Sequence, residues 1–171
     1  MEVNSTMELN PYARYLDGRP LQTILASTVP EIARYLEAMG ASKAVIPPAP
    51  GKWSAAEIIC HLADCELEFA GRLRQTLAED APTIQPFDQE KWAATYPGIT
   101  AEQAFAAFSA FRAWNLLLIS AALPAAATRP VTHPERGAMT FLTLVETLAG
   151  HDLNHLTQLQ KQAGPVGIQS P

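Results

Sequence analysis

The distribution of proline constrains the fold of this chain more than any other feature of its sequence. The 171 residues include 14 prolines, and proline is excluded from helix interiors because it lacks the backbone N–H and clashes with the preceding turn. Three long stretches contain no proline: 51–81, 98–123 and 135–164. A fourth stretch, 21–39, is interrupted only at Pro30. We therefore predict four helical segments.

Local signals mark where three of these helices begin. Ser54 and Glu57 have the spacing of a capping box, in which a hydroxyl and a carboxylate bond to each other's backbone N–H groups. Thr100 and Gln103 repeat that pattern, and the last helix is expected to begin near Thr140. Each predicted start therefore lies within a proline-free stretch.

The remaining segments complete the predicted architecture. The first helical segment is expected as two pieces, Leu21–Ser27 and Pro30–Met39. The connection 79–99 is long for a compact domain, and Asp88 within it is placed to cap one short helical turn. No stretch alternates with the period of a strand, so we expect no sheet. The predicted fold is an all-α four-helix bundle.

Three of the four histidines fall inside predicted helices. His151 and His155 are four residues apart, so their side chains lie on one helix face, and the apolar stripe of that helix continues through both. His61 lies at the edge of the core face of its own helix. A buried imidazole without a partner costs roughly 1–3 kcal/mol, and one shared cation would satisfy all three. Three nitrogen ligands with one open position are typical of a catalytic zinc site.

The positions of these histidines along their helices also predict the topology. His61 lies near the start of its helix, whereas His151 and His155 lie nearer the end of theirs. The three histidines come closer to the same level along the bundle axis if the second and fourth helices are antiparallel. That arrangement requires the connection 79–99 to cross the bundle. We therefore predict an up-down-down-up order with a long crossover between helices 2 and 3.

Other polar residues near these positions have two interpretations each. Asp64 shares a face with His61 and is a candidate to orient its imidazole, as carboxylates often do for metal-bound histidines. Asp152 points about 100° away from the preceding histidine, so we interpret it as a solvated surface charge. Cys65 is interpreted as a small buried hydrophobe, with a fourth, site-closing ligand as the alternative. His133 lies in a proline-flanked loop and is interpreted as structural, with a role at the site mouth as the alternative.

Composition and the chain start exclude several classes of partner. With 12 Lys and Arg against 17 Asp and Glu, the net charge is −5, which does not favour nucleic acid. No apolar run approaches the roughly 18 residues that span a membrane. The segment Met1–Thr6 has neither the basic nor the apolar region of a secretory signal. Cys60 and Cys65 are too far apart on one helix for a disulfide, so we expect reduced thiols and a cytoplasmic protein.

Several stretches of the sequence resemble one known family. The chain is similar to the DinB-like four-helix-bundle metalloproteins, in the branch of metal-dependent hydrolases and bacillithiol transferases. We treat residues 1–171 as a single domain of this type, and the resemblance covers about residues 50–160. The matching stretches appear in the family's order: 53–64, 79–92, 132–137 and 151–158.

The resemblance implies a metal site and a range of reactions. It implies one divalent metal ion, usually nickel or zinc, held by His61, His151 and His155 with water in the remaining positions. It also implies that some members transfer a low-molecular-weight thiol onto electrophiles, whereas many have no established reaction. A homodimer is expected from the family.

The metal is the centre of the predicted chemistry. The sequence has no clear Ser/His/Asp triad and no phosphate-binding glycine loop, so a metal would have to activate the nucleophile. We predict a hydrolase or thiol S-transferase that activates water or a low-molecular-weight thiol, with a small-molecule electrophile or thiol as partner. The first alternative is a non-catalytic module in which the metal is structural and the bundle binds a partner or dimerises. A second is a small-ligand carrier that uses the bundle interior.

Overall fold

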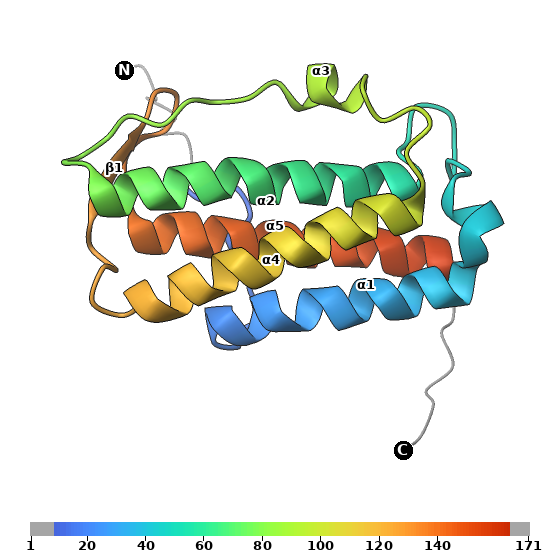
Figure 1. Cartoon of the computed structure of the whole chain (residues 1–171), viewed down its shortest axis with the longest axis horizontal. Helices are drawn as coiled ribbons and strands as arrows, with labels where there is room; N and C mark the ends of the chain where they lie inside the picture. The colour runs from blue at the N-terminus through green and yellow to red at the C-terminus, as the bar shows by residue number, and fades with distance from the viewer. Residues whose placement is uncertain (1–8, 165–171) are drawn as a thin grey trace, which may run out of the picture.

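Four long helices build the molecule and lie side by side along one axis (Figure 1). The computed structural model describes residues 9–164, so Met1–Thr6 and the other residues at both ends lie outside the described part. This architecture confirms the predicted all-α four-helix bundle. The helices are α1 (Leu21–Ala44), α2 (Ala55–Ala78), α4 (Ala101–Ala122) and α5 (Phe141–Ala163).

The direction of the helices confirms the up-down-down-up order. In Figure 1, α1 and α5 run one way, and α2 and α4 run the other way. The connection from α2 to α4 crosses the length of the bundle and contains the short helix α3 (Gln89–Ala93), which Asp88 caps as predicted. Because α5 is antiparallel to α2, residues in the first half of α2 lie level with residues in the middle of α5.

The caps of the long helices are those that the sequence predicts. The Ser54 hydroxyl accepts the Glu57 backbone N–H, and the Glu57 carboxylate accepts the Ser54 N–H at 2.7 Å. Thr100 and Gln103 form the same reciprocal pair at the start of α4, and Thr140 caps α5. Each cap satisfies backbone donors that the first helical turn leaves without partners.

The first helix differs from its prediction. Helix α1 (Leu21–Ala44) passes through Pro30 without ending. Pro30 and Ala26, whose carbonyl loses its helical partner, are both on the exposed side, where water can replace the missing bond. Packing of the opposite face against α4 and α5 offsets the penalty of the proline. The helical geometry is instead broken at Gly40, which has φ 70° and ψ 158°.

A small sheet is also present, which makes the prediction of no sheet wrong. β1 (Pro130–His133) pairs antiparallel with β2 (Gly137–Thr140). Each strand has four residues, too few to show the alternation on which sequence-based recognition of strands depends. The hairpin buries Met139 and His133, and its first strand bonds to residues 82–84 of the crossover. It therefore ties the crossover to the end of the bundle.

A buried network of charged and polar side chains joins all four long helices at the bundle centre. Arg112 of α4 donates to Glu66 of α2 and to Asp152 of α5, each at 2.6 Å, and all three side chains are at most 1% exposed. Thr28 donates to Asp152 at 2.7 Å, and Asn115 donates to Glu66 at 2.9 Å. The interpretation of Asp152 as a surface charge is therefore wrong. The helical spacing of Asp152 on α5 could not show that Arg112 of another helix, α4, supplies its counter-charge.

Helix α4 has an unusually apolar sequence. Among the described residues, it is the one helix that is long and apolar enough to cross a membrane by length and composition alone, and only 28% of its most apolar window is buried. This is weak evidence for a membrane, since α4 also carries the buried Arg112 and packs within the bundle. Its large exposed apolar side chains are Phe111, Trp114 and Leu117.

Candidate metal centre

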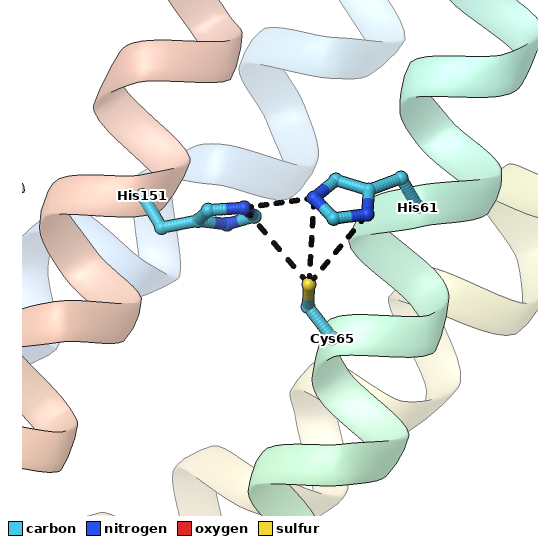
Figure 2. A group of neighbouring side chains, drawn as sticks. All are labelled: His61, Cys65 and His151. Carbon is cyan, nitrogen blue, oxygen red and sulfur yellow. Dashed lines mark hydrogen bonds between the residues drawn. The ribbon is translucent and has the colours of Figure 1, made fainter. Parts of the chain in front are cut away.

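The three predicted histidines converge between α2 and α5. The Nε2 atom of His151 lies 2.9 Å from that of His61 and 3.1 Å from that of His155. All three imidazoles are at least 94% buried. Figure 2 shows His61 reaching across from α2 toward His151 on α5. The antiparallel arrangement of these two helices brings side chains 90 residues apart into contact.

The spacing of the nitrogens suits one shared cation. Metal–nitrogen bonds of roughly 2.0–2.1 Å place two ligand nitrogens about 2.9 Å apart at a right angle and about 3.4 Å apart at a tetrahedral angle. Two of the three nitrogen pairs, both of which include His151, fall within that interval at 2.9 and 3.1 Å. The donor set is therefore compatible with a divalent metal, whereas metal binding by these residues stays a prediction.

The hydrogen bonds of the imidazoles support the same conclusion. Gln158 Oε1 lies 3.2 Å from His155 Nδ1, and this contact favours the tautomer with the proton on Nδ1 and a free lone pair on Nε2. Within residues 9–164, His151 Nδ1 is buried without a hydrogen-bond partner. Its Nε2 has either one proton or one lone pair and cannot form a good hydrogen bond to both neighbours. A cation that accepts all the lone pairs removes this conflict.

Burial also keeps the histidines in the form that binds metals. Desolvation lowers the pKa of His61 to about 3 and that of His155 to about 4. The same effect, together with its histidine neighbours, lowers the pKa of His151 well below its ordinary value. The imidazoles are therefore neutral at pH 7, and neutral nitrogen is the metal-binding form.

Cys65 lies beside this cluster, although the sequence analysis interpreted it as a small buried hydrophobe. Its Sγ atom is 3.6 Å from His61 Nε2 and 3.9 Å from His151 Nε2 (Figure 2). His61, Cys65 and His151 form a group of mutually close potential ligands. Burial raises the pKa of the Cys65 thiol, so the thiol is protonated without a metal. Cys60 is buried as well, and neither cysteine forms a disulfide, as expected.

Asp64 does not orient His61 as its spacing suggested, and Trp53 contacts His61 instead. Asp64 accepts a 2.7 Å hydrogen bond from the Tyr96 hydroxyl, which fixes the connection before α4 and leaves no described bond to His61. Trp53, next to the α2 cap, packs its ring against that of His61 with centroids 4.9 Å apart. The orientation of His61 is therefore supported by an aromatic ring and not by a carboxylate.

Two cavities adjoin the histidine cluster. One of about 160 Å³ is bordered by His61, Cys65 and His151, and His133 also lines it. The role at the site mouth considered for His133 is thus compatible with its place. A second cavity, of about 340 Å³, is bordered by His61 and His155. Tyr12 lines both cavities, and sequence analysis missed it because no periodic pattern links the amino-terminal segment to the helices.

The comparisons with known proteins identify the family of this chain. A family model described as the DinB superfamily matches residues 25–159. The chain belongs to the DinB superfamily. The family resemblance inferred from the sequence motifs is therefore confirmed. The matched range includes all four long helices of the bundle almost completely, and His61, His151 and His155 fall within it.

Individual members of the DinB superfamily are similar to this chain over different lengths. YfiT of Bacillus subtilis is 23% identical over 149 residues, which cover 82% of this chain and 83% of YfiT. A protein of Oceanobacillus iheyensis is 27% identical over 110 residues, and the match spans only 64% of that relative. Both relatives bear the provisional name metal-dependent hydrolase.

The solved structure of YfiT shows the same fold. It superposes with a TM-score of 0.69 at 20% identity and covers 82% of this chain and 84% of YfiT. YfiT is described as having an unusual four-helix bundle topology. The crossover between α2 and α4 in this DinB-superfamily chain is in keeping with that description.

Gly150 positions the amino-terminal segment of this DinB-superfamily bundle over His151. A Cβ atom at Gly150 would lie 2.5 Å from the Tyr12 carbonyl oxygen, and the Tyr12 ring packs edge-on against His151. We expect Gly150→Ala to lower the free energy of unfolding by about 1–3 kcal/mol through overpacking. Gly71→Ala, in an open position on α2, should raise it by about 0.5–1 kcal/mol. Urea denaturation measures both, and equal effects would contradict the role of Gly150.

The buried neutral histidines predict a pH-dependent stability of the metal-free protein. Because the folded pKa values of His61 and His155 are about 3 and 4, the unfolded chain binds more protons below its ordinary histidine pKa of about 6.5. Stability should therefore fall as the pH drops from 6.5 toward 4, by up to about 1.4 kcal/mol per pH unit and histidine. Urea denaturation with chelator at pH 7 and pH 5 measures this loss.

The control for this pH dependence is the His61→Asn/His155→Asn variant. It should lose less stability between pH 7 and pH 5 than the unmodified chain, because asparagine does not titrate. The same slope in both proteins would show that other groups cause the acid sensitivity.

Proposed function

We propose that this protein binds one divalent metal ion, zinc or nickel, through His61, His151 and His155 and uses it to activate water or a low-molecular-weight thiol. The observation that carries the proposal is the buried Nε2 atom of His151, which lies 2.9 Å from that of His61 and 3.1 Å from that of His155. The provisional name of its relatives, metal-dependent hydrolase, supports the metal.

The protein residues bind the metal and shape the space beside it. A bound divalent cation supplies a Lewis acid that lowers the pKa of a coordinated water or thiol toward neutrality. The cavity of about 160 Å³ next to His61 and His151 has room for a small second reactant. Tyr12 and Phe69 form part of its wall. Attack by activated water would give hydrolysis, and attack by an activated thiol would give an S-conjugate.

A second candidate function is a non-catalytic module in which the metal only stabilises the bundle. The observation that favours it is Cys65, whose thiol lies 3.6 Å from His61 Nε2. A bound thiolate would occupy the position that a reactant needs. Cys65 lines the same cavity as His61 and His151, and a metal deprotonates a thiol that it binds. Whether a Cys65→Ser variant keeps the metal therefore decides whether Cys65 is a ligand or part of the cavity wall.

Metal content and metal-dependent turnover test these two functions together. Protein purified without nickel resin is analysed for metal and then assayed for ester hydrolysis and for conjugation of thiols to 1-chloro-2,4-dinitrobenzene. We expect about one ion per chain, and turnover in one assay that chelation removes and zinc or nickel restores. Bound metal without turnover in either assay would support the non-catalytic module. Protein that binds no zinc or nickel would overturn both functions.

The oligomeric state, the cellular location and the partners of the protein are also proposals. We propose a homodimer in the cytoplasm whose only other partners are small molecules. Exposed Trp114 and Leu117 on α4 are consistent with self-association. Sedimentation velocity of the intact protein measures the oligomeric state, and a monomer at all concentrations would exclude the homodimer.

A further inference from the structure

We propose that the cavity beside the metal centre binds a carboxylate group of the substrate, which Arg136, Arg72 and His133 recognise. This inference rests on the proposed function, because it names the class of small molecule that the metal centre would act on: an organic acid. The two arginines and His133 come from α2 and the β1–β2 hairpin, and all three line the same cavity as His61, Cys65 and His151.

Arg72 is a rigid, partly satisfied cation in this wall. Its side chain is 9% exposed, and Glu68 accepts from it at 3.1 Å. Its Nη2 atom also donates to the Gln85 carbonyl at 2.6 Å, and the Phe69 and Phe87 rings lie within 6 Å of the guanidinium. Within residues 9–164 its Nη1 atom has no hydrogen-bond partner. The guanidinium is thus held in place with one donor group unused.

His133 supplies a second donor. Its Nδ1 atom accepts the Glu135 backbone N–H at 3.2 Å, so the ring proton of the neutral imidazole is on Nε2. The side chain is 4% exposed. Burial, followed by the positive charges of Arg136 and Arg72, lowers its pKa. His133 is therefore a neutral hydrogen-bond donor close to both arginines, and it has no carboxylate as a side-chain partner in the described structure.

Arg136 carries a positive charge that the described protein leaves unmatched. It forms no ion pair in the described part of the chain, although Arg72 beside it is paired with Glu68. One carboxylate, that of the exposed Glu135, lines the cavity together with the two arginines. The cavity is thus relatively positive in a chain of net charge −5, and a metal would add to that charge.

A carboxylate fits these donors better than a neutral group does. A guanidinium and a carboxylate can form two parallel charge-assisted hydrogen bonds, which are stronger and more directional than neutral ones. Phe69, Pro86 and Phe87 supply apolar wall for the rest of a small molecule. Together they describe a small organic acid whose charged end meets the arginines while its reactive end lies near His61 and His151.

Benzoate and its neutral analogue benzamide test this inference. Their binding to the intact metal-loaded protein is measured by isothermal titration calorimetry, and again after metal removal with a chelator. We expect benzoate to bind more tightly than benzamide. Arg136→Gln should weaken benzoate binding roughly tenfold or more and leave benzamide binding unchanged. Arg34→Gln, an exposed arginine on α1, removes the same charge away from the cavity and should change neither.

The arms of this experiment separate the two proposals. Equal binding of benzoate and benzamide, or equal effects of Arg136→Gln and Arg34→Gln, would overturn the carboxylate site even if the metal is present. Protein that binds no metal would overturn the proposed function, while the effect of Arg136→Gln on benzoate could still be measured. If benzoate binds only to the metal-loaded protein and Arg136→Gln does not weaken its binding, the carboxylate binds the metal. That result would contradict the inference.

Discussion

Replacing His151 with alanine should abolish metal binding, reducing the content from about one ion per chain to none. The Nε2 atom of His151 lies between those of His61 and His155, at 2.9 and 3.1 Å. Its removal therefore breaks both close nitrogen pairs and leaves two ligands that no longer share a neighbour. Elemental analysis and calorimetric titration with zinc measure the loss.

Thermal unfolding gives an independent measure of the same effect. Zinc at 100 times its Kd stabilises the folded protein by about 2.7 kcal/mol, which corresponds to a rise in Tm of roughly 5–10 °C for a domain of this size. The unmodified protein should show this rise, and His151→Ala should not.

Two variants serve as controls for the ligand assignment. His133→Ala removes a histidine that lines the cavity but lies outside the cluster, and it should keep the metal. Cys65→Ser should keep it too if the three histidines hold it. Full retention of metal by His151→Ala would refute the ligand set. Loss of metal in Cys65→Ser would instead identify the thiol as a ligand and favour the non-catalytic module.

Replacing Arg112 with methionine should have the largest effect on stability, a loss of about 3–5 kcal/mol in the free energy of unfolding. Arg112 is the shared partner of Glu66 and Asp152, and all three side chains are at most 1% exposed. Without it, two carboxylates remain buried with no counter-charge. Domains are typically stable by only about 5–15 kcal/mol, so urea denaturation should show a large shift.

The control variants test whether the unpaired charges cause this loss. Arg34→Met, on the exposed side of α1, should change stability by less than about 0.5 kcal/mol. Arg112→Met combined with Glu66→Gln and Asp152→Asn removes all three charges and should recover part of the loss. If Arg112→Met is as mild as Arg34→Met, the network does not stabilise the bundle.

The helices were predictable because their signals are local. Ser54 with Glu57 and Thr100 with Gln103 bond within one turn, so their spacing in the sequence is enough to locate the helix starts. The hairpin and the continuity of α1 through Pro30 were not predictable in this way. Both depend on packing against other elements: the hairpin against residues 82–84, and α1 against α4 and α5.

The candidate site was predictable in part. The four-residue spacing of His151 and His155 places two imidazoles on one face, and the position of His61 in its helix matches them if the helices are antiparallel. The environment of the site was not predictable, since its members come from separate segments. Tyr12 precedes the first helix and Arg136 lies in the hairpin, yet both line the cavity of the histidine cluster.

The sequence by itself determined where α2, α4 and α5 begin, the family, and the placement of three histidines inside helices, because backbone capping and helical periodicity act over a few residues. Only the tertiary structure decided the surroundings of those histidines. It placed Cys65 beside His61 and His151, directed Asp64 to Tyr96, and buried Asp152 against Arg112. Charge pairing and burial depend on which helices meet. Apart from the contact of Cys65 with His61 inside α2, these contacts join side chains at least 32 residues apart, and no local pattern encodes them.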